Sequence, residues 1–492
     1  MRHTSPSPIT ENLTLDPQDW STMRRLAHQA LDEMLDFQTD VRNRPVWREV
    51  PEASLDLMAQ AAPRAGLGSE QVVADMLQHV VPYPSGHAHP RFWGWVCGTG
   101  TPIGMVADML AAGVNASSGA FNDAPSRIEA QLIGWMRDLF DFPETTSGIV
   151  TSGGSVANMI GLAVGRDAII GEPLRQRGLT GLSGTPVVYT SDQVHSSVDK
   201  AMMLLGLGTD NLRKVGTDDQ YRIDLDALRA AIEADRRRGL RPLAIVGNAG
   251  TVNTGALDDL TGLAEIARHE GLWFHVDGAI GAIAAMSPKI RKKLRGMERA
   301  DSLAFDFHKW LYVPYEAGCV LIRNSKLHRQ SFSVAATYLE TPPRGIAAQP
   351  DSTYLRGPQL SRGFKALKVW AQIREYGMDA LGRIQEQNVA QVQYLSQLIQ
   401  AEPRLEQSAP SPLNILCFRY LPEHLGADQT DAINYELLMR LQERGIAAPS
   451  STRLNGQFVL RVANTNHRTR FEDFALLVAE TVRLGREIEA GL

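Results

Sequence analysis

Residues 302–310 read SLAFDFHKW. The pattern predicts a short apolar strand at 303–307 that ends in the polar pair His308 and Lys309, with a second apolar run at 310–313. A lysine between two apolar runs has no easy route to bulk water. It either extends its amine to solvent from a strand end, or its basicity is lowered so that the amine can attack a carbonyl as a Schiff-base nucleophile. The residues upstream favour the second role.

The chain between about 145 and 325 alternates short apolar strands with helical segments. Strands are predicted at 148–150, 186–189, 243–246 and 272–276, and helices at 155–164, after His195, from the N-cap Asp224 to Gly239, and at 260–267. This alternation is typical of an α/β fold in which helices cover both faces of a mainly parallel sheet. In such sheets ligands bind beyond the carboxyl ends of the strands. The residues that follow each strand are therefore the candidate site residues.

Four polar groups follow these strands in order along the chain. The turn 152–155, Ser-Gly-Gly-Ser, opens a helix, and its free N–H groups, hydroxyls and positive helix end suit a phosphate. His195, Asp277 and Lys309 follow later strands. One ligand would use all four groups, because pyridoxal 5'-phosphate has a phosphate, an aldehyde for the amine of Lys309 and a ring nitrogen for the carboxylate of Asp277. Their joint occurrence predicts this cofactor.

Each group also has a simpler interpretation. Glycine turns are common, and Asp277 taken alone fits a helix cap or a paired core acid. The segment 153–157 nearly matches the nucleophile elbow of a serine hydrolase with Ser155 as the nucleophile, but Ala157 stands where the tight turn requires glycine. A serine hydrolase therefore stays an alternative.

The chain resembles the group II pyridoxal-phosphate-dependent decarboxylases, which include aromatic-L-amino-acid and glutamate decarboxylases. The similar motifs are HPRF at 89–92, TSGGSVAN at 151–158, HVDGA at 275–279, ADSLAFDFHKW at 300–310 and LSRGFKALKVW at 360–370. The pairing of HVDGA with HKW, in which Lys309 stands 32 residues after Asp277, is highly specific. The resemblance implies the PLP-dependent transferase fold type I, with a mainly parallel seven-stranded-type sheet, and a homodimer with active sites at the subunit interface.

The resemblance also implies roles for single residues. His195 would stack on the cofactor ring, the phosphate would lie near Gly154, Ser155 and His308, and the ring would be supported by Thr251 and Ala279. The candidate cofactor-binding residues are Gly153, Gly154, Ser155, His195, Thr251, Asp277, Ala279, Asp306, His308, Lys309 and Ser361. Asp306 stands where the aromatic decarboxylases carry Asn, and Phe307 replaces a smaller residue or proline. In the family a tyrosine of a mobile loop supplies a proton; Tyr354 is the candidate here, with Tyr338 as the alternative.

These roles predict loss of CO2 from an L-amino acid, with the catalytic residues Lys309, His195, Asp277 and Tyr354. Phe92, Trp93, Trp95 and Gly98 are the candidate substrate pocket, which favours an aromatic side chain; the alternative is a packed corner of the core. Arginines that could receive an acidic side chain instead are Arg356, Arg362 and Arg461, for which structural roles are the alternative. Other outcomes stay open: oxidative deamination that gives an aldehyde, an acidic or diamino substrate, or a retired enzyme that acts as a scaffold.

Composition excludes several classes of protein. The net charge of -5 predicts no face for nucleic acid or anionic lipid. No apolar run approaches the roughly 20 residues that span a bilayer, and residues 1–14 lack the apolar core of a signal peptide, so we expect a cytoplasmic protein. The three cysteines stand far apart, which predicts no disulfide framework; only Cys97 stands near a candidate site residue. His87 and His89 lack a partner at zinc-site spacing, so no metal is expected.

Three domains are predicted. Residues 1–98 would form a helical arm that packs on the partner subunit, residues 99–370 the large cofactor-binding domain, and residues 371–492 a small α+β domain. The first helix of the arm is expected to begin at Asp16 as N-cap, and the second to cover 69–80. The later elements that we expect are a helical stretch at 362–398, strands at 414–418 and 458–462, and helices at 431–444 and 471–487. The Pro- and Gly-rich segment 326–360 predicts a loop that closes over the site.

Overall fold

The structure is a computed structural model that describes residues 13–171, 173–334, 342–348 and 352–491. Two compact units divide these residues. The N-terminal unit contains 48–85 and the described residues before 45, and the main unit contains 45–47 and the described residues from 86 onward. Tyr338, the alternative loop tyrosine, lies outside the described residues.

The N-terminal unit is helical. It contains α1 (Trp20–Asp40), a 3-10 turn (Val41–Asn43), α2 (Glu52–Met58) and α3 (Ser69–Asp75), which continues as a π-helical turn (Met76–Val80). The predicted helix at 69–80 is confirmed, whereas Asp16 is not the N-cap of the first helix. Asp19 takes that position because its carboxylate accepts the free backbone N–H groups of Ser21 and Thr22, at 2.9 and 3.2 Å.

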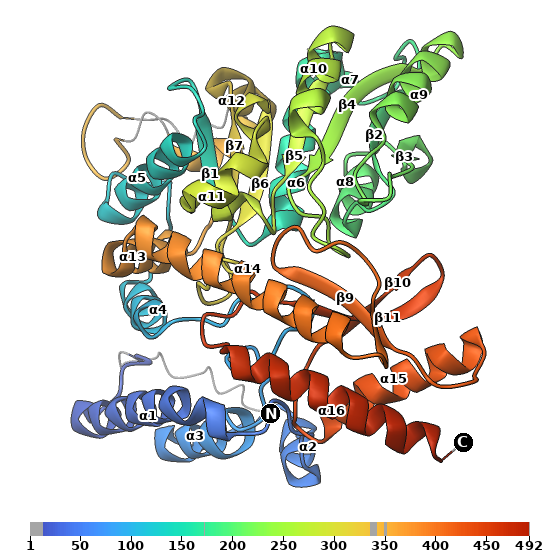
Figure 1. The fold of residues 1–492 in the computed structure, drawn as a ribbon. Helices are drawn as coiled ribbons and strands as arrows, with labels where there is room; N and C mark the ends of the chain where they lie inside the picture. Colours follow the sequence, from blue (N-terminus) through green and yellow to red (C-terminus); the bar gives the residue numbers. More distant parts are fainter. Residues whose placement is uncertain (1–12, 172, 335–341, 349–351, 492) are drawn as a thin grey trace, which may run out of the picture. The chain divides into compact units, whose positions relative to one another are not determined.

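A seven-stranded sheet forms the centre of the main unit, with the order β1-β7-β6-β5-β4-β2-β3 (Figure 1). Its strands are β1 (Ser147–Thr151), β2 (Pro186–Ser191), β3 (Leu212–Val215), β4 (Arg241–Asn248), β5 (Trp273–Asp277), β6 (Ser302–Asp306) and β7 (Gly318–Ile322). Within the described residues, β7 pairs antiparallel with β1 and β6, and the other pairs are parallel. The predicted mainly parallel sheet is confirmed.

Helices cover both faces of this sheet. One face is covered by α5 (Ala124–Leu139), α9 (Leu225–Arg237) and α10 (Leu260–Glu270), and the other by α6 (Gly154–Ile170), α8 (Ser196–Leu204) and α12 (Ser325–Phe332). The remaining helices of this part of the chain are α4 (Pro102–Val114), α7 (Pro173–Arg177), α11 (Pro288–Arg291) and α13 (Ala366–Tyr376). Successive strand residues point to opposite faces. In β6, Leu303 and Phe305 pack with α5 and α10 on one face, whereas Ala304 packs with α6 and α8 on the other.

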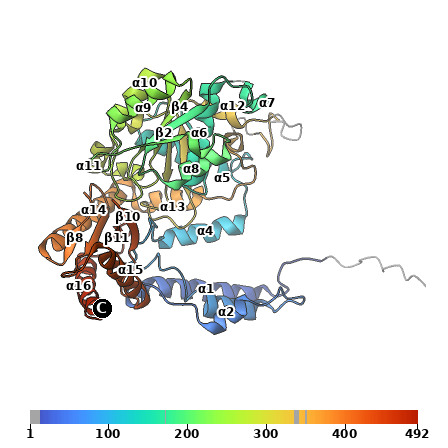
Figure 2. The ribbon, with the colours of Figure 1, turned by 90° about the vertical axis from the view of Figure 1, so that its right-hand side faces the viewer.

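A second sheet, with the order β10-β11-β9-β8, lies beyond one end of the first in both views (Figures 1 and 2). Its strands are β8 (Leu405–Gln407), β9 (Ile415–Tyr420), β10 (Ser450–Leu454) and β11 (Gln457–Ala463), and its helices are α14 (Met378–Ala401), α15 (Ala427–Glu443) and α16 (Phe471–Glu489). All its strand pairs are antiparallel, and the sheet has its own apolar core. The expected small α+β domain is present.

Two expected segments differ from the structure. The helical stretch predicted at 362–398 is broken at Gly377, whose φ of 72° lies in the region that glycine adopts without strain, so α13 and α14 are separate helices. The segment predicted as a loop at 326–360 contains most of α12 and a 3-10 turn (Thr353–Arg356). In the described part of the chain, no helix combines the length and apolar character needed to cross a membrane.

Candidate active site

Lys309 stands just beyond the carboxyl end of β6, where a second segment of the chain crosses close to it. The backbone N–H of Gly98 donates to the carbonyl oxygen of His308 at 3.1 Å. A Cβ at position 98 would lie 2.4 Å from the carbonyl oxygens of both His308 and Lys309, so only glycine allows this approach. The crossing segment therefore brings Trp95, Val96 and Cys97 to the lysine.

The amine of Lys309 pairs with Asp306, the last residue of β6. Its Nζ lies 2.8 Å from Oδ2 of Asp306, a carboxylate that is 1% exposed. Burial disfavours the ammonium form, but the charge and hydrogen bond of Asp306 outweigh it and raise the pKa of Lys309 above its ordinary value. The expected lowering of basicity is therefore wrong for the amine beside this carboxylate. Removing the negative charge would leave burial as the main influence.

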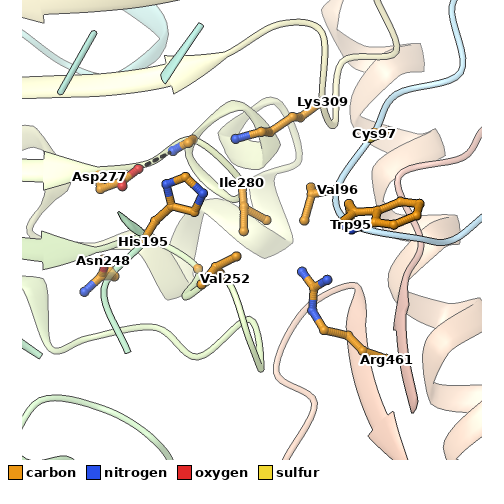
Figure 3. A pocket seen from close by; sticks show the side chains of 12 residues that line it. Trp95, Val96, Cys97, His195, Asn248, Val252, Asp277, Ile280, Lys309 and Arg461 are labelled. Atoms are coloured by element: carbon orange, nitrogen blue, oxygen red, sulfur yellow. Dashed lines mark hydrogen bonds between the residues drawn. The ribbon is translucent and has the colours of Figure 1, made fainter. Parts of the chain in front are cut away.

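Asp277 ends β5, the neighbour of β6 in the sheet. Its Oδ1 accepts the backbone N–H of Ala279 at 3.1 Å, and its Oδ2 accepts Nδ2 of Asn158 at 2.9 Å. Asp277 and Lys309 line one cavity of about 220 Å³, and Figure 3 shows them extending into it from opposite sides. The structure thus brings the two predicted partners of the cofactor to one space.

His195 lies beside Asp277 in the same cavity (Figure 3). It is the N-cap of α8, and its Nδ1 accepts the backbone N–H of Ser197 at 3.1 Å. Burial lowers the pKa of His195, and the nearby carboxylates of Asp277 and Asp306 only partly oppose this effect. The imidazole is therefore neutral at neutral pH.

The turn before α6 forms a second hollow of about 450 Å³, which adjoins the first at His195, Ala279 and Lys309. It is lined by Gly153, Gly154 and Ser155 at the N-terminus of α6. A Cβ on Gly153 would lie 3.2 Å from Cε1 of His308, and one on Gly154 would lie 3.0 Å from Oδ2 of Asp306. The glycines thus keep the N-terminal backbone of α6 open to an anion.

His308 closes the other side of this hollow. Its Nδ1 lies 2.9 Å from the carbonyl oxygen of Ala317, and its ring centroid lies 4.4 Å from that of Tyr315. Burial lowers the pKa of His308, so the ring is a neutral neighbour of the anion site. His308 therefore lines the hollow that the glycine turn opens, and its place beside a phosphate stays a prediction.

Comparison with known proteins identifies the family. Residues 51–421 match the family model described as the pyridoxal-dependent decarboxylase conserved domain. The chain belongs to this family. It is 32% identical to an aromatic-L-amino-acid decarboxylase of Bacillus atrophaeus over 484 residues, which cover 98% of each chain.

Two further proteins are similar to this decarboxylase over most of its length. A phenylacetaldehyde synthase of Arabidopsis thaliana is 28% identical over 460 residues, which cover 91% of this chain and 93% of the relative. The solved structure of Oryza sativa TDC with PLP and tryptamine has a TM-score of 0.88 and 26% identity, and the match covers 97% of this chain and 100% of that one. The predicted fold type I of the PLP-dependent transferases is confirmed.

The site of this decarboxylase fits pyridoxal 5'-phosphate, the cofactor of its family. The two adjoining hollows, about 220 and 450 Å³, are together in the range of roughly 300–1,000 Å³ that is usual for small-molecule sites. The glycine turn offers N–H groups to the phosphate, Asp277 offers a carboxylate to the ring nitrogen, and Lys309 offers its amine to the aldehyde. The residues present therefore match the chemistry of each end of the cofactor.

Most predicted site residues of this decarboxylase line the two hollows. These are Gly153, Gly154, Ser155, His195, Asp277, Ala279, Asp306, His308, Lys309 and Trp95. Thr251 does not line them: it is buried, and its Oγ1 accepts the N–H of Ala256 at 3.0 Å, while its neighbours Gly250 and Val252 face the cavity. Ser361 is exposed and lies outside both hollows.

Two of the aromatic residues predicted for the substrate pocket belong to the core instead. Trp93 is fully buried in the core of the second sheet, where its ring stacks on Phe474 at 4.6 Å and its Nε1 donates to Oγ1 of Thr469 at 3.0 Å. Phe92 packs with Val46 and Ala448. Of the three aromatic residues, Trp95 alone lines the described cavity.

Tyr354 is also absent from the residues that line the two hollows. It lies in the 3-10 turn Thr353–Arg356, whose ends are held from other elements. Oγ1 of Thr353 accepts Nη1 of Arg362 at 2.8 Å, and Nε2 of His328 donates to the carbonyl oxygen of Arg356 at 2.7 Å. The role of Tyr354 as a proton donor stays a prediction.

Arg461, one of the three arginines considered for an acidic side chain, enters the cavity from β11 of the second sheet, as Figure 3 shows. Val252 and Ile280, which were not predicted, form an apolar wall of the same cavity. Arg362, by contrast, is paired with Glu129 in the core, at 3.1 Å between Nη1 and Oε2.

Ser155 and the histidines show no further catalytic pairing. Within the described residues, no hydrogen bond joins Ser155 to a histidine, and Nδ1 of His195 accepts hydrogen bonds from Ser197. A serine nucleophile needs such a base, so the hydrolase alternative has no structural support. No group of three or more metal-binding side chains occurs in the part of the chain that is described.

Proposed function

We propose that this decarboxylase converts an aromatic L-amino acid into the corresponding amine and CO2. The observation that carries the proposal is one cavity that holds the amine of Lys309, the carboxylate of Asp277 and, toward the second sheet, the guanidinium of Arg461. Bound pyridoxal phosphate supplies an aldehyde that captures the amino acid and a ring that withdraws electrons from its α-carbon. The side chains of this cavity bind and orient the substrate around that chemistry.

Arg461 is the group that we infer to bind the substrate carboxylate. It is 4% exposed; its Nε donates to the carbonyl oxygen of Asn253 at 3.1 Å and its Nη1 to Oγ of Ser450 at 3.0 Å. Its buried Nη2 has no hydrogen-bond partner among the described residues. A buried guanidinium nitrogen without a partner is costly, and a carboxylate is the acceptor that satisfies it best. Hydrogen bonds hold two nitrogens of the Arg461 guanidinium in place, so the third nitrogen keeps a fixed position toward the cavity.

The apolar wall supports an aromatic side chain. Trp95, Val96, Val252 and Ile280 line the same cavity as Arg461. Such a wall gains from the burial of an aromatic ring and leaves no partner for a charged side chain. The relatives named as aromatic-amino-acid decarboxylases agree with this preference. An acidic substrate would need Arg461 for its side chain. Apart from Lys309, which serves the cofactor, the described residues that line this cavity offer no second Lys or Arg to the α-carboxylate.

His195 is the proton donor that the cavity supports within this chain. Its neutral ring accepts hydrogen bonds at Nδ1, so its proton is on Nε2 and available to the cavity. Asp277 holds a proton on the ring nitrogen, and Lys309 takes or returns the proton of the incoming amine. Tyr354 is proposed only as a second donor, because it does not line the hollows of its own chain.

A panel of L-amino acids tests the proposal, with CO2 release and mass spectrometry of the products as the readouts. At least one aromatic amino acid is expected to lose CO2 and give its amine. Lys309→Ala is expected to lose both this activity and the visible absorption of the bound cofactor. Retention of that absorption would refute the assignment of Lys309, and holoenzyme that releases no CO2 from any aromatic amino acid would refute the proposed substrate class.

An aldehyde-forming reaction is the second candidate, because one relative is a phenylacetaldehyde synthase. This outcome couples loss of CO2 to oxidative removal of the amine by O2, so it releases ammonia and hydrogen peroxide together with the aldehyde. One incubation that measures CO2, amine, aldehyde and hydrogen peroxide separates the two reactions. Amine in proportion to CO2, without peroxide, is the result that we expect.

The enzyme is further proposed to be a cytoplasmic homodimer with the domains 1–98, 99–370 and 371–492. The support for a dimer is an N-terminal unit that exposes apolar side chains on its short helices, namely Leu55, Met58, Val72, Met76 and Val80. An apolar surface of this kind needs a partner. Light scattering on the purified enzyme is expected to give twice the mass of 54.0 kDa. A monomer would refute the dimer, and cell fractionation tests the location.

A further inference from the structure

Asn158 lies fully buried in the second turn of α6, and its side chain touches three polar groups. Its Nδ2 lies 2.9 Å from Oδ2 of Asp277 and 2.9 Å from Oγ of Ser197. Its Oδ1 lies 2.9 Å from Nε2 of His275. Asn158 is therefore the branch point between Asp277, which receives the cofactor ring nitrogen, and Ser197, which holds His195.

The direction of each hydrogen bond follows from the carboxylate of Asp277. An ionised carboxylate only accepts, so the atom of Asn158 that faces it is the amide nitrogen. The amide oxygen then faces His275, whose Nε2 must donate. Burial lowers the pKa of His275 to about 4, so this ring is neutral and its Nδ1 carries no proton. Nδ1 accepts the hydroxyl of Ser302 at 2.8 Å, and that oxygen in turn accepts Nε1 of Trp273 at 2.8 Å.

The second branch fixes His195. The second hydrogen of the Asn158 amide goes to Oγ of Ser197, so the hydroxyl hydrogen of Ser197 is free to donate to Nδ1 of His195 at 2.8 Å. The backbone N–H of Ser197 donates to the same nitrogen at 3.1 Å. Nδ1 therefore stays unprotonated, and the single proton of the neutral ring stays on Nε2.

Packing holds the ring of His275 in place. A Cβ on Gly161, one turn after Asn158 on α6, would lie 2.6 Å from Cε1 and 2.7 Å from Nδ1 of His275. The ring is also fully buried. His275 thus cannot turn to offer its unprotonated nitrogen to Asn158 without moving α6. A histidine outside both hollows controls the orientation of an amide that touches Asp277.

We propose that Asn158 and His275 are positioning residues, which together keep the carboxylate of Asp277 aimed at the cofactor and keep the proton of His195 on Nε2. The proposal rests on the assigned roles of Asp277 and His195 in the proposed function. It differs from a packing role because it depends on which atom donates. A side chain of equal size with the donor in the wrong place is expected to fail.

Two variants of His275 separate donation from packing. In His275→Gln the side-chain amide takes the place of Nε2 and can donate to Asn158, whereas in His275→Asn it takes the place of Nδ1 and leaves the oxygen of Asn158 without a donor. A buried polar atom left without its partner costs about 1–3 kcal/mol, which corresponds to roughly 5- to 150-fold. We expect the affinity of the full-length enzyme for pyridoxal phosphate, measured by equilibrium dialysis of the holoenzyme, to fall about tenfold or more in His275→Asn and less than about threefold in His275→Gln.

Asn158→Asp is the direct test, because it replaces both donated hydrogens by acceptors that face Asp277 and Ser197. Its cofactor affinity is expected to fall by at least as much as that of His275→Asn. Asn434→Asp is the matched control: Asn434 is equally buried, and its Nδ2 donates to carbonyl oxygens of Tyr420 and Thr430 at 2.9 and 2.8 Å in the second sheet's domain. Folding of each variant is checked by circular dichroism, and the control is expected to keep its cofactor affinity.

Nitrogen NMR of the holoenzyme with 15N-labelled histidine gives a readout that a packing role would not move. The Nε2 of His195 is expected to be protonated and its Nδ1 unprotonated from pH 6 to 8. A proton on Nδ1, equal affinities of the two His275 variants, or wild-type affinity in Asn158→Asp would each overturn the proposal. Failure of the proposed function is distinguishable, because an enzyme that decarboxylates no amino acid would still show these cofactor affinities and nitrogen shifts.

Discussion

Replacing Asp306 by Asn removes the charge that holds Lys309 as a cation. The carboxylate oxygen and the amine nitrogen lie 2.8 Å apart, and the two side chains are 1% and 20% exposed. With an effective dielectric constant of about 20, Coulomb's law gives about 6 kcal/mol for two unit charges at this separation. Losing this attraction lowers the pKa of Lys309. The amide dipole of Asn retains only part of the attraction, so burial becomes the main influence on that pKa.

The sign of the effect follows from the pairing. Asp306 raises the pKa of Lys309 above its ordinary value, so the amine is protonated at neutral pH and cannot attack an aldehyde. Without Asp306, burial lowers that pKa, and the neutral fraction at a given pH increases about tenfold for each unit. The D306N variant is therefore expected to capture pyridoxal phosphate faster than the wild type between pH 7 and 8.

Mixing cofactor-free, full-length protein with pyridoxal phosphate at several pH values measures this rate as growth of the visible absorption band. The pH at which the rate reaches half its maximum is expected to move down in D306N. Asp301→Asn is the matched control, since Asp301 stands just before the other end of β6 and its carboxylate accepts the backbone N–H of Phe274 at 2.9 Å. An unchanged midpoint in D306N, or one that moves up, would refute the assigned role of Asp306.

Arg461→Gln is expected to raise KM for amino-acid substrates by roughly 10- to 150-fold, because a hydrogen bond to a charged group contributes about 1.5–3 kcal/mol. Inhibition by the amine product, which lacks a carboxylate, should be unchanged. Equal losses of affinity for the substrate and for the amine would contradict carboxylate binding by Arg461. Cys97 is expected to react with iodoacetamide at pH 7 before the other two cysteines, as measured by mass spectrometry. Burial raises the pKa of Cys97, but the hydrogen bond and charge of His87 outweigh burial and lower it. His87→Ala should shift the reaction of Cys97 to higher pH, and equal labelling of all three cysteines would contradict this prediction. Gly98→Ala is expected to lose the visible absorption band of the cofactor while keeping its circular dichroism, because the added Cβ would lie 2.4 Å from the carbonyl oxygen of Lys309. An intact band would show that the crossing segment can accommodate a Cβ at this position.

The sequence predicted the chemical centre of the site because strand ends can be recognised one at a time. Asp277 and Lys309 each follow a short apolar run, and the rule that parallel strands end at one edge brings them together. β5 and β6 are in fact neighbours, with Asp277 paired with Ala304. No contact between distant residues had to be known. The glycine turn 152–155 and His195 were found in the same way.

The substrate side of the site could not be predicted by that rule. Phe92, Trp93 and Trp95 are equally aromatic in the sequence, and the difference between them arises from the second sheet, which takes Trp93 into its core. The carbonyl oxygen of Trp93 accepts the N–H of Ala463, and its own N–H donates to Ala448, both at 2.9 Å. These contacts join segments more than 350 residues apart. Local patterns carry no information about them.

Asn158 was missed for a different reason. It belongs to the quoted motif TSGGSVAN, but a buried asparagine on a helix has many structural roles. Its function depends on three contacts at 2.9 Å, two with residues of β5 and one with a residue of α8. The basicity of Lys309 was misjudged similarly, because its partner Asp306 was interpreted only as a cofactor residue. In both cases the residues were known from the sequence, but the hydrogen bond between them was not.

The two carboxylates of the site are held in opposite ways, and this difference determines how each can serve the reaction. Asp277 accepts two neutral N–H donors, from Ala279 and Asn158, so its charge is stabilised whether or not Lys309 is a cation. Apart from the Lys309 ammonium, neither oxygen of Asp306 has a hydrogen-bond donor among the described residues. A buried carboxylate with a single cationic partner depends on that partner to stabilise it. A change at Lys309 therefore affects Asp306 directly, whereas Asp277 keeps its two backbone and side-chain donors.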